Sequence, residues 1–409
     1  MKNSFAFHIM TKPTGPLCNL DCTYCFYLEK EKIYPNTKHW SMNYEVLENY
    51  IKQYISAQSV NEITFSWQGG EPTILGIEFF QKAIDLQKKY SNGKNIFNSF
   101  QTNGILLNDD WGKILSENNF LVGISIDGPK EIHDKYRVFK GGQNSFDQVL
   151  NGISILKKHN VEFNTLTCVQ KDNSLKPLEV YNFLKEIGSG FIQFIPVIER
   201  RTKSKNTNVL ELISPNYTGD AEITEWSVKS LQYGKFLSAI FDEWVKNDVG
   251  KIFVQIFDLS LESWIGEQPS LCVFRETCGS AMALEHNGDL YSCDHYVYQE
   301  NKLGNIMTEA LEKLVDSNKQ LKFGLDKKIN LTKYCRNCEF LFACNGECPK
   351  HRFIKSPDGE GGLNYLCAGY KYFFSHIDPY MKFMANELLN ERPPANVMNW
   401  ARNKKQIPQ

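Results

Sequence analysis

The stretch Leu17-Cys18-Asn19-Leu20-Asp21-Cys22-Thr23-Tyr24-Cys25-Phe26 carries three cysteines in the spacing C-x-x-x-C-x-x-C. Three thiolates on one short loop can ligate three irons of a 4Fe–4S cube and leave the fourth iron open for chemistry, whereas four thiolates make a closed electron carrier. Zinc is a weaker alternative because it needs four ligands and usually takes cysteines as C-x-x-C pairs. Disulfides are also disfavoured, because two or three intervening residues make poor loops. The loop therefore predicts a cluster with one open iron.

Composition restricts the compartment and the class of partner. The chain has 409 residues, with 46 Lys and Arg against 47 Asp and Glu, and a net charge of −1. This balance argues against nucleic-acid binding as the main task. We also expect no signal peptide and no membrane span. Twelve cysteines favour a reducing cytoplasm and metal or cluster ligation over secreted disulfides.

The first two hundred residues alternate strand-like and helix-like segments. Strands are expected at residues 5–10, 62–67, 96–101, 120–126, 162–169 and 191–197. Amphipathic helices are expected at 43–56, 77–90, 109–118, 145–159 and 177–187. Such an α/β succession predicts a parallel sheet with helices outside, which right-handed crossovers curl into a barrel or part of one. The functional loops should lie at the carboxyl ends of the strands, where the cysteine loop follows the first strand.

The rest of the chain divides into three parts by pattern. Residues 198–224 are polar without clear periodicity and are expected to form a surface excursion near the barrel mouth. Helical periodicity returns over 227–247 and again over 381–389, and the polar end is expected to fray. The predicted domains are a barrel at 1–225, a helical linker region at 226–270, a cysteine-rich domain at 271–385 and a tail at 386–409.

A second loop carries the sequence Ser66-Trp67-Gln68-Gly69-Gly70-Glu71-Pro72-Thr73 after the second predicted strand. Adjacent glycines let a backbone edge approach a ligand closely, and Glu71 offers a hydrogen-bond acceptor. Taken alone, the segment is typical of a strand-to-helix turn with proline at the helix start. Beside the cysteine loop it resembles the GGEP motif of the radical S-adenosylmethionine (SAM) enzymes. The cysteine spacing, with aromatic Tyr24 before the last cysteine, resembles their signature.

The resemblance to radical SAM enzymes implies a cofactor site. In that family the open iron chelates the amino and carboxylate groups of SAM, and one electron cleaves SAM to methionine and a 5′-deoxyadenosyl radical. Segments 100–104 and 123–128 end two predicted strands with small polar groups where SAM would lie, although each also fits an ordinary polar turn. The fork of a guanidinium suits the SAM carboxylate. The cofactor-binding candidates are Tyr24, Gln68, Gly69, Gly70, Glu71, Ser125 and Arg137. His133 and Asp134 are expected to be solvated helix residues.

Eight further cysteines form a second group. They are Cys272, Cys278, Cys293, Cys335, Cys338, Cys344, Cys348 and Cys367. Eight thiolates make two four-cysteine sites, which suit two structural zincs as well as two 4Fe–4S clusters. Spacing alone does not separate these alternatives. Together with the N-terminal motif, the pattern resembles the SPASM domain, which carries two auxiliary 4Fe–4S clusters.

The resemblance covers residues 8–385. The strings CNLDCTYCFYLEK, QGGEPT, QTNG, LVGISIDGPKEIH, YSCDHYV, LGNI, FLFACNGECPK and LNYLC are similar to those of the anaerobic sulfatase-maturating enzymes. This implies a partial (β/α)6 TIM-like radical SAM barrel followed by a SPASM domain. It also implies that Cys18, Cys22 and Cys25 hold the radical SAM cluster. The first auxiliary cluster would take Cys272, Cys278, Cys293 and Cys348, and the second Cys335, Cys338, Cys344 and Cys367. Cys168 matches no ligand position and is expected in the core of the fifth strand.

The same resemblance implies an activity and its catalytic base. The radical would take a hydrogen from Cβ of a Cys or Ser in an unfolded sulfatase polypeptide, Asp294 would take the thiol or hydroxyl proton, and an auxiliary cluster the second electron. The product would be Cα-formylglycine. Gln68 and Tyr27 are candidates for contacting the substrate peptide, and the role of His295 is open. An electron donor such as flavodoxin or ferredoxin is implied, with neither nucleic acid nor membrane as a partner.

Two other functions fit parts of the pattern. One is a SPASM-type peptide maturase that forms thioether or C–C crosslinks. Such enzymes often carry an extra N-terminal domain, for which a cysteine loop beginning at residue 18 leaves no room. The other is a non-enzymatic zinc or cluster scaffold, which would need neither the open-iron triad nor the Gly69-Gly70-Glu71 loop. About twelve irons per chain, rather than two zincs, would distinguish the enzyme from a zinc scaffold.

Overall fold

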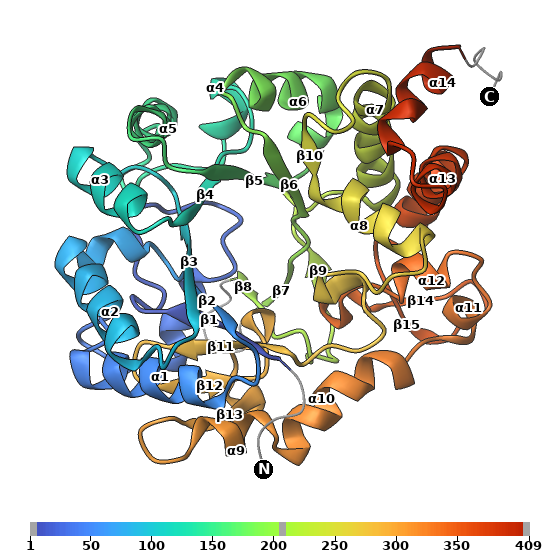
Figure 1. The fold of residues 1–409 in the computed structure, drawn as a ribbon. Coiled ribbons are helices and arrows are strands. Elements are labelled where there is room, and N and C mark those ends of the chain that lie inside the picture. Colours follow the sequence, from blue (N-terminus) through green and yellow to red (C-terminus); the bar gives the residue numbers. More distant parts are fainter. Residues whose placement is uncertain (1–5, 204–209, 404–409) are drawn as a thin grey trace.

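The structure is a computed structural model that describes residues 6–203 and 210–403. Within these residues, one sheet has ten strands in the order β10-β6-β5-β4-β3-β2-β1-β11-β12-β13. Strands β1 to β6 run parallel. They span His8–Lys12, Glu62–Trp67, Asn95–Thr102, Leu121–Ser125, Phe163–Val169 and Phe191–Pro196. The sheet curves into an incomplete ring (Figure 1), which confirms the predicted partial barrel.

The expected helices lie on the outer side of this ring (Figure 1). They are α1 (Tyr44–Ala57), α2 (Ile77–Tyr90), α3 (Asp109–Glu117), α5 (Phe146–Lys158) and α6 (Pro177–Glu186). Asn43 and Asn108 cap α1 and α3, because their side chains accept the N–H groups of Val46 and Trp111. Such caps satisfy backbone donors that have no partner within the helix. The alternation of buried strands and amphipathic helices explains why the sequence predicts these elements within a few residues.

Residues 198–224 are more regular than expected. They contain β7 (Arg200–Lys203), β8 (Leu210–Leu212) and β9 (Glu222–Ile223), which form a small antiparallel sheet in the order β8-β7-β9. Residues 204–209, including the Lys203-Ser204-Lys205-Asn206 stretch beyond Lys203, lie outside the described residues. Strands this short show no periodicity in the sequence, so their pairing was missed.

The segment after residue 225 continues the barrel wall. It contains α7 (Ser230–Asn247), β10 (Phe253–Val254) and α8 (Gln255–Trp264). Strand β10 pairs in parallel with β6 and so extends the edge of the sheet. The sheet therefore does not stop at residue 225, and the division of the chain into domains stays a prediction.

The cysteine-rich part is joined to the barrel by strand pairing. Strand β11 (Ala281–Glu285) pairs in parallel with β1, with His8 opposite Ala281 and Lys12 opposite Glu285. Strands β12 (Asp289–Tyr291) and β13 (Lys302–Asn305) continue the sheet in antiparallel pairs. The β11–β12 turn thus lies at the carboxyl end of β1, and β12 runs back from it, so that Tyr291 at its end lies opposite Ala283, the partner of Met10.

Short helices and one long helix complete this part. They are α9 (Leu311–Val315), α10 (Asn318–Ile329), α11 (Lys333–Arg336), α12 (Leu341–Cys344), α13 (Cys367–Leu389) and α14 (Val397–Asn403), with the hairpin β14 (Ile354–Lys355) and β15 (Gly361–Leu363). The helix expected at 381–389 begins earlier, at Cys367, and packs along α7 on the barrel. No helix among residues 6–203 and 210–403 is both long enough and apolar enough to cross a membrane.

Candidate active site

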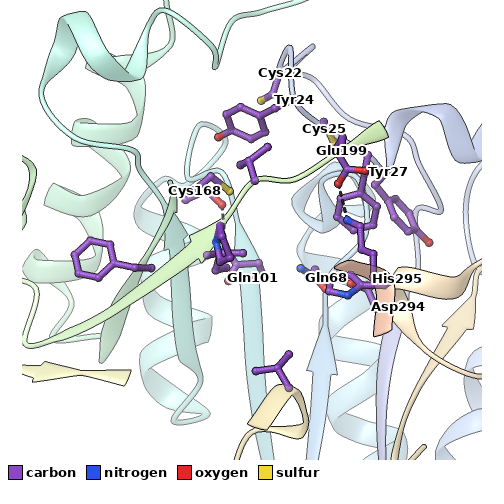
Figure 2. Close-up of a pocket in the computed structure, with 18 of the residues that line it drawn as sticks. Cys22, Tyr24, Cys25, Tyr27, Gln68, Gln101, Cys168, Glu199, Asp294 and His295 are labelled. Carbon is purple, nitrogen blue, oxygen red and sulfur yellow. Dashed lines mark hydrogen bonds and ion pairs between the residues drawn. The ribbon is translucent and has the colours of Figure 1, made fainter. Parts of the chain in front are cut away.

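A cavity of about 280 Å³ lies where the barrel mouth meets the cysteine-rich part. Its wall includes the cysteine loop, the loops after β2, β3 and β4, and the turn that carries Asp294 and His295. Figure 2 shows the cysteine loop on one side of this space and Gln68, Asp294 and His295 on another. Its volume is close to the lower end of the range for small-molecule sites. Residues far apart in sequence thus share one chamber.

The glycine loop is bound to the cysteine loop through the backbone. The N–H of Gly70 donates to Gly15 O at 2.7 Å, and the N–H of Glu71 donates to Leu17 O at 2.8 Å. A Cβ added to Gly70 would lie 2.0 Å from Leu17 O. Gly69 has φ +141°, a backbone conformation that favours glycine. The two glycines therefore let one loop hold the other in place.

Replacing Gly70 with alanine should displace the cysteine loop, because the added Cβ would overlap Leu17 O, a backbone atom that can move only together with its loop. We expect a stability loss of about 1–3 kcal/mol and lower iron content after reconstitution. Thermal unfolding and iron analysis are the measurements. Gly190→Ala is the matched control, because a Cβ there meets nothing within 4 Å. Equal stability and iron in both variants would contradict the close approach.

The carboxylate of Glu71 is held by groups of the protein itself. Its Oε1 accepts from Thr73 N at 3.0 Å, Thr73 Oγ1 at 2.6 Å and Thr102 Oγ1 at 2.7 Å. Its Oε2 accepts from Asn103 N at 2.7 Å. Glu71 therefore braces the loops after β2 and β3. Its contact with SAM stays a prediction, as do those of Gly69 and Gly70.

Arg137 lies in a buried network. Its Nε lies 3.1 Å from Asp127 Oδ2, and one terminal nitrogen is 3.7 Å from Cys168 Sγ. The hydroxyl of Tyr24 also donates to Asp127. Ser125 lines the same wall, and its hydroxyl accepts from Gln101 Nε2 at 3.0 Å. Asp127 thus fixes the fork of Arg137, which faces the cavity predicted to take SAM.

Asp294 faces the cavity beside a buried lysine. Lys12 Nζ lies 2.5 Å from Asp294 Oδ1 and donates to Gln68 Oε1 at 2.9 Å. The same ammonium lies 4.4 Å from the ring centre of Tyr27, whose hydroxyl donates to Glu285. Burial alone would raise the pKa of Asp294, but Lys12, His295 and Lys30 outweigh it and hold that pKa below its usual value. The carboxylate is thus kept ionised and able to accept a proton.

Two sequence expectations about polar and sulfur side chains are wrong. His133 is fully buried rather than solvated, with Nδ1 3.4 Å from the Asp127 N–H and Nε2 3.1 Å from Ser145 Oγ. The Asp134 carboxylate accepts the N–H groups of Ser145 and Phe146 at the start of α5, so it is a cap. Cys168 does lie on β5, but it is partly exposed to the cavity rather than enclosed in the core.

The cysteines form three neighbouring groups. Burial raises the pKa of Cys22, and the thiols Cys25 and Cys18 raise it further. Burial and then Cys348 and Cys272 raise that of Cys293, and Cys272 also acts on Cys278. Burial, Cys335 and Cys338 raise the pKa of Cys367. Burial, Glu347, Cys367 and Cys335 raise the pKa of Cys344. Each predicted ligand set thus contains thiols that neighbour one another, as a cluster site requires, while Cys168 also neighbours Cys25.

The twelve cysteines all belong to the described part of the chain, and none of them forms a disulfide. Across that same part, no three His, Cys, Asp or Glu side chains converge closely enough to hold a single metal ion. The assignment of individual cysteines to clusters stays a prediction. It rests on which thiols neighbour one another.

Several residues of the site are not predicted by any motif in the sequence. Lys12 is the last residue of β1, and the carboxyl ends of barrel strands are where functional residues lie, so its position is the signal that could have indicated it. Lys30 is buried, with Nζ 3.3 Å from the ring centre of Tyr298, and burial lowers its pKa to about 7. Lys350 pairs with Glu199 at 2.5 Å in the cavity wall. The last pair joins segments with no common motif, so nothing local indicated it.

Comparisons with known proteins agree with this geometry. Residues 13–184 match the radical SAM superfamily, and residues 272–339 match the SPASM iron-sulfur cluster-binding domain. The first match contains the cysteine loop and the glycine loop. The second contains five of the eight cysteines of the C-terminal group: Cys272, Cys278, Cys293, Cys335 and Cys338.

Full-length relatives share both parts. The chain is 49% identical to the serine-type anaerobic sulfatase-maturating enzyme of Bacteroides thetaiotaomicron, over 96% of this chain and 94% of that protein. It is 35% identical to the cysteine-type enzyme of Clostridium perfringens, over 93% of this chain and 98% of that protein. The solved structure of native anSMEcpe with bound AdoMet and Cp18Cys peptide superposes with a TM-score of 0.81 at 34% identity, covering 94% of this chain and 100% of that one.

Proposed function

The chain belongs to the anaerobic sulfatase-maturating enzymes of the radical SAM superfamily, and we propose that its preferred target is a serine side chain. It oxidises an active-site Cys or Ser of a sulfatase to Cα-formylglycine, with SAM and 4Fe–4S clusters as cofactors. The serine preference is supported by the 49% identity to the serine-type enzyme of Bacteroides thetaiotaomicron. The other serine-type relatives are 34–35% identical, the same as the cysteine-type relatives. Membership in this family sets aside the crosslinking maturase and the scaffold as alternatives.

The cofactors have candidate ligands at the cavity. Cys18, Cys22 and Cys25 would hold the SAM-binding cluster, and the two sets of four thiols the auxiliary clusters. SAM would lie against Tyr24, Gln68, Gly69, Gly70, Glu71, Ser125 and Arg137, all of which line the cavity. When bound, SAM and its cluster would supply the radical that takes a hydrogen from Cβ, and an auxiliary cluster would accept the second electron.

One observation carries the assignment of the base: the Asp294 carboxylate faces the cavity and is paired with the buried Lys12. Since Oδ1 faces the ammonium, Oδ2 would accept the proton of the target hydroxyl or thiol. Removal of a Cβ hydrogen, this proton and one electron leaves an aldehyde from serine. From cysteine the same losses leave a thioaldehyde, which water hydrolyses to the same product. Gln68 and Tyr27 would position the peptide.

The remaining assignments concern the setting of the reaction. The substrate segment would be unfolded, because the target must reach a cavity behind the barrel mouth. The electron for SAM cleavage would come from a small donor such as flavodoxin or ferredoxin. The enzyme would work in the cytoplasm, whose reducing conditions preserve cysteine thiols and iron–sulfur clusters. Neither nucleic acid nor a membrane would be a partner.

Two synthetic peptides that differ only in Ser or Cys at the target position test this function. Reconstituted enzyme, SAM and reductant are incubated with each peptide without oxygen, and mass spectrometry follows the aldehyde. We expect formylglycine from both peptides and a higher kcat/KM for serine. A higher kcat/KM for cysteine would contradict the preference. Aldehyde from neither peptide, with normal 5′-deoxyadenosine release, would contradict the proposed base chemistry as well.

A further inference from the structure

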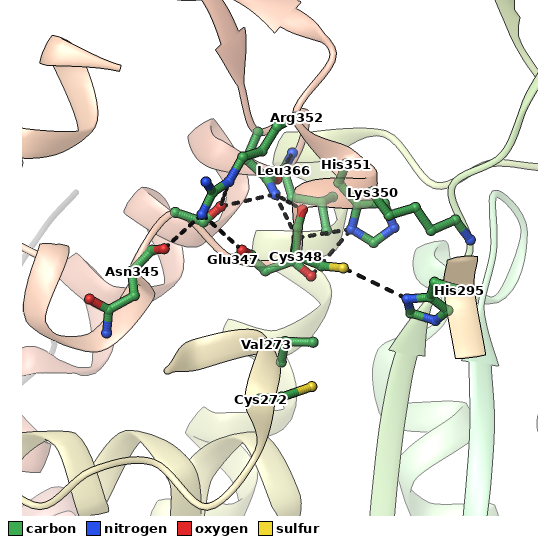
Figure 3. Close-up of polar contacts among 12 residues, drawn as sticks. Cys272, Val273, His295, Asn345, Glu347, Cys348, Lys350, His351, Arg352 and Leu366 are labelled. Atoms are coloured by element: carbon green, nitrogen blue, oxygen red, sulfur yellow. Dashed lines mark hydrogen bonds and ion pairs between the residues drawn. The ribbon is translucent and has the colours of Figure 1, made fainter. Parts of the chain in front are cut away.

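The imidazole of His295 contacts one thiol of the first auxiliary set. Its Nδ1 lies 3.7 Å from Cys348 Sγ, within hydrogen-bond distance for sulfur. Figure 3 shows the ring facing Cys348, with Cys272 of the same set nearby. The ring also packs edge-on against Phe26 at 5.6 Å between centres. The histidine is thus held between the cavity wall and a predicted cluster ligand.

The direction of this hydrogen bond follows from the chemistry of the thiol. A cysteine that binds iron is a thiolate and has no proton to donate. The hydrogen must therefore lie on Nδ1, and the contact becomes a charge-assisted N–H···S bond. Cys348 is only 7% exposed, so water competes little for the sulfur. A hydrogen bond in such a place is stronger than one in solvent.

Hydrogen bonds to cluster sulfurs favour the reduced, more negative state and raise the reduction potential. The backbone N–H of Lys350 also donates to the Cys348 thiol, whereas the neighbouring side chains bind one another. Arg352 donates to the backbone oxygens of Lys327, Asn345, Gly346 and Glu347, and the Glu347 carboxylate pairs with His351. His295 is the side chain from the barrel-facing turn that reaches the sulfur itself.

We propose that His295 raises the reduction potential of the cluster held by Cys272, Cys278, Cys293 and Cys348 by donating its Nδ1–H to Cys348 Sγ. His295 is therefore a positioning residue: it acts through Cys348 on the cluster that would accept the second electron of the oxidation. This role rests on the proposed function. It directly follows Asp294 in the 3-10 turn Asp294–Tyr296. One short turn thus carries the acceptor of the proton and the group that favours acceptance of the electron.

The test compares His295→Phe with His295→Asn in reconstituted enzyme. Phenylalanine keeps the ring contact with Phe26 and has no donor, whereas the asparagine amide can place a donor near the position of Nδ1. Redox titration followed by electron paramagnetic resonance gives the potential of each cluster. We expect one potential to fall in the phenylalanine variant and to return toward wild type in the asparagine variant. His376→Phe is the control, because His376 pairs with Asp242 on the outer helices.

The outcomes separate this role from a purely structural one. Unchanged potentials in His295→Phe, at full iron content, would overturn the proposal. If that variant loses iron, wild-type enzyme with ¹⁵N-histidine replaces it. A ¹⁵N coupling to the reduced cluster would support the hydrogen bond, and no coupling would overturn it. If wild-type enzyme makes no aldehyde from either peptide but the potential still falls in His295→Phe, the proposed function is refuted while the hydrogen bond to the cluster thiolate stands.

Discussion

Cys22→Ala enzyme is expected to release no 5′-deoxyadenosine, while most of the fold and the auxiliary clusters remain. Cys22 is one of three thiols that neighbour one another on the loop after β1. Two thiolates cannot replace three in holding a cube with one open iron. The eight cysteines of the other two groups lie after residue 271. Loss of the first site should therefore spare theirs, and SAM cleavage should fall below detection.

Iron content and 5′-deoxyadenosine release measure this effect together. The variant should lose about four of about twelve irons per chain, and its thermal unfolding should stay close to wild type. Cys168→Ala is the matched control for iron, because Cys168 lies in the same cavity and neighbours Cys25 but belongs to none of the predicted ligand sets. It should keep all of its iron. SAM cleavage at the wild-type rate in Cys22→Ala would show that this triad does not hold the reactive cluster.

The barrel could be predicted from the sequence because its signals are local. Each strand is a short buried run between amphipathic segments, so β2 and α2 match the predicted ranges to the residue. The cysteine loop and the glycine loop could be placed for the same reason, since both follow strands. What no local pattern indicated is their backbone contact, in which Gly70 N–H donates to Gly15 O.

Long-range pairing explains what the sequence did not reveal. Strand β11 pairs with β1 across about 270 residues, with Lys12 opposite Glu285. This pairing places the hairpin that leads to Asp294 beside β1, and the Asp294 carboxylate meets the Lys12 ammonium. No local pattern in either segment predicts that contact. His133 was misjudged for a related reason. A histidine on a short polar helix looks solvated, but the Asp127 N–H and Ser145 hydroxyl enclose it in the fold.

Asp294→Asn should uncouple the two halves of the reaction. The substitution keeps the shape of the side chain and removes its ability to accept a proton at neutral pH. SAM cleavage depends on the cysteine loop and should continue at least in part. Formylglycine should fall by about 10²–10⁴-fold, the usual contribution of a general base. The expected signature is 5′-deoxyadenosine without aldehyde, measured in the same anaerobic reaction.

The ion pair with Lys12 makes a control necessary, because removal of one partner leaves a buried ammonium and costs stability. Asp289→Asn provides it. Asp289 lies on the same hairpin, and its buried carboxylate pairs with Lys302 at 2.7 Å. It does not line the cavity. It should lower stability while keeping the ratio of aldehyde to 5′-deoxyadenosine.

If Asp294→Asn loses SAM cleavage as well as product, Asp294 supports the structure beside Cys293 and is not the base. If aldehyde forms at the normal rate, another group takes the proton, and His295 is the next candidate because Gln68 carries an amide and cannot act as a base.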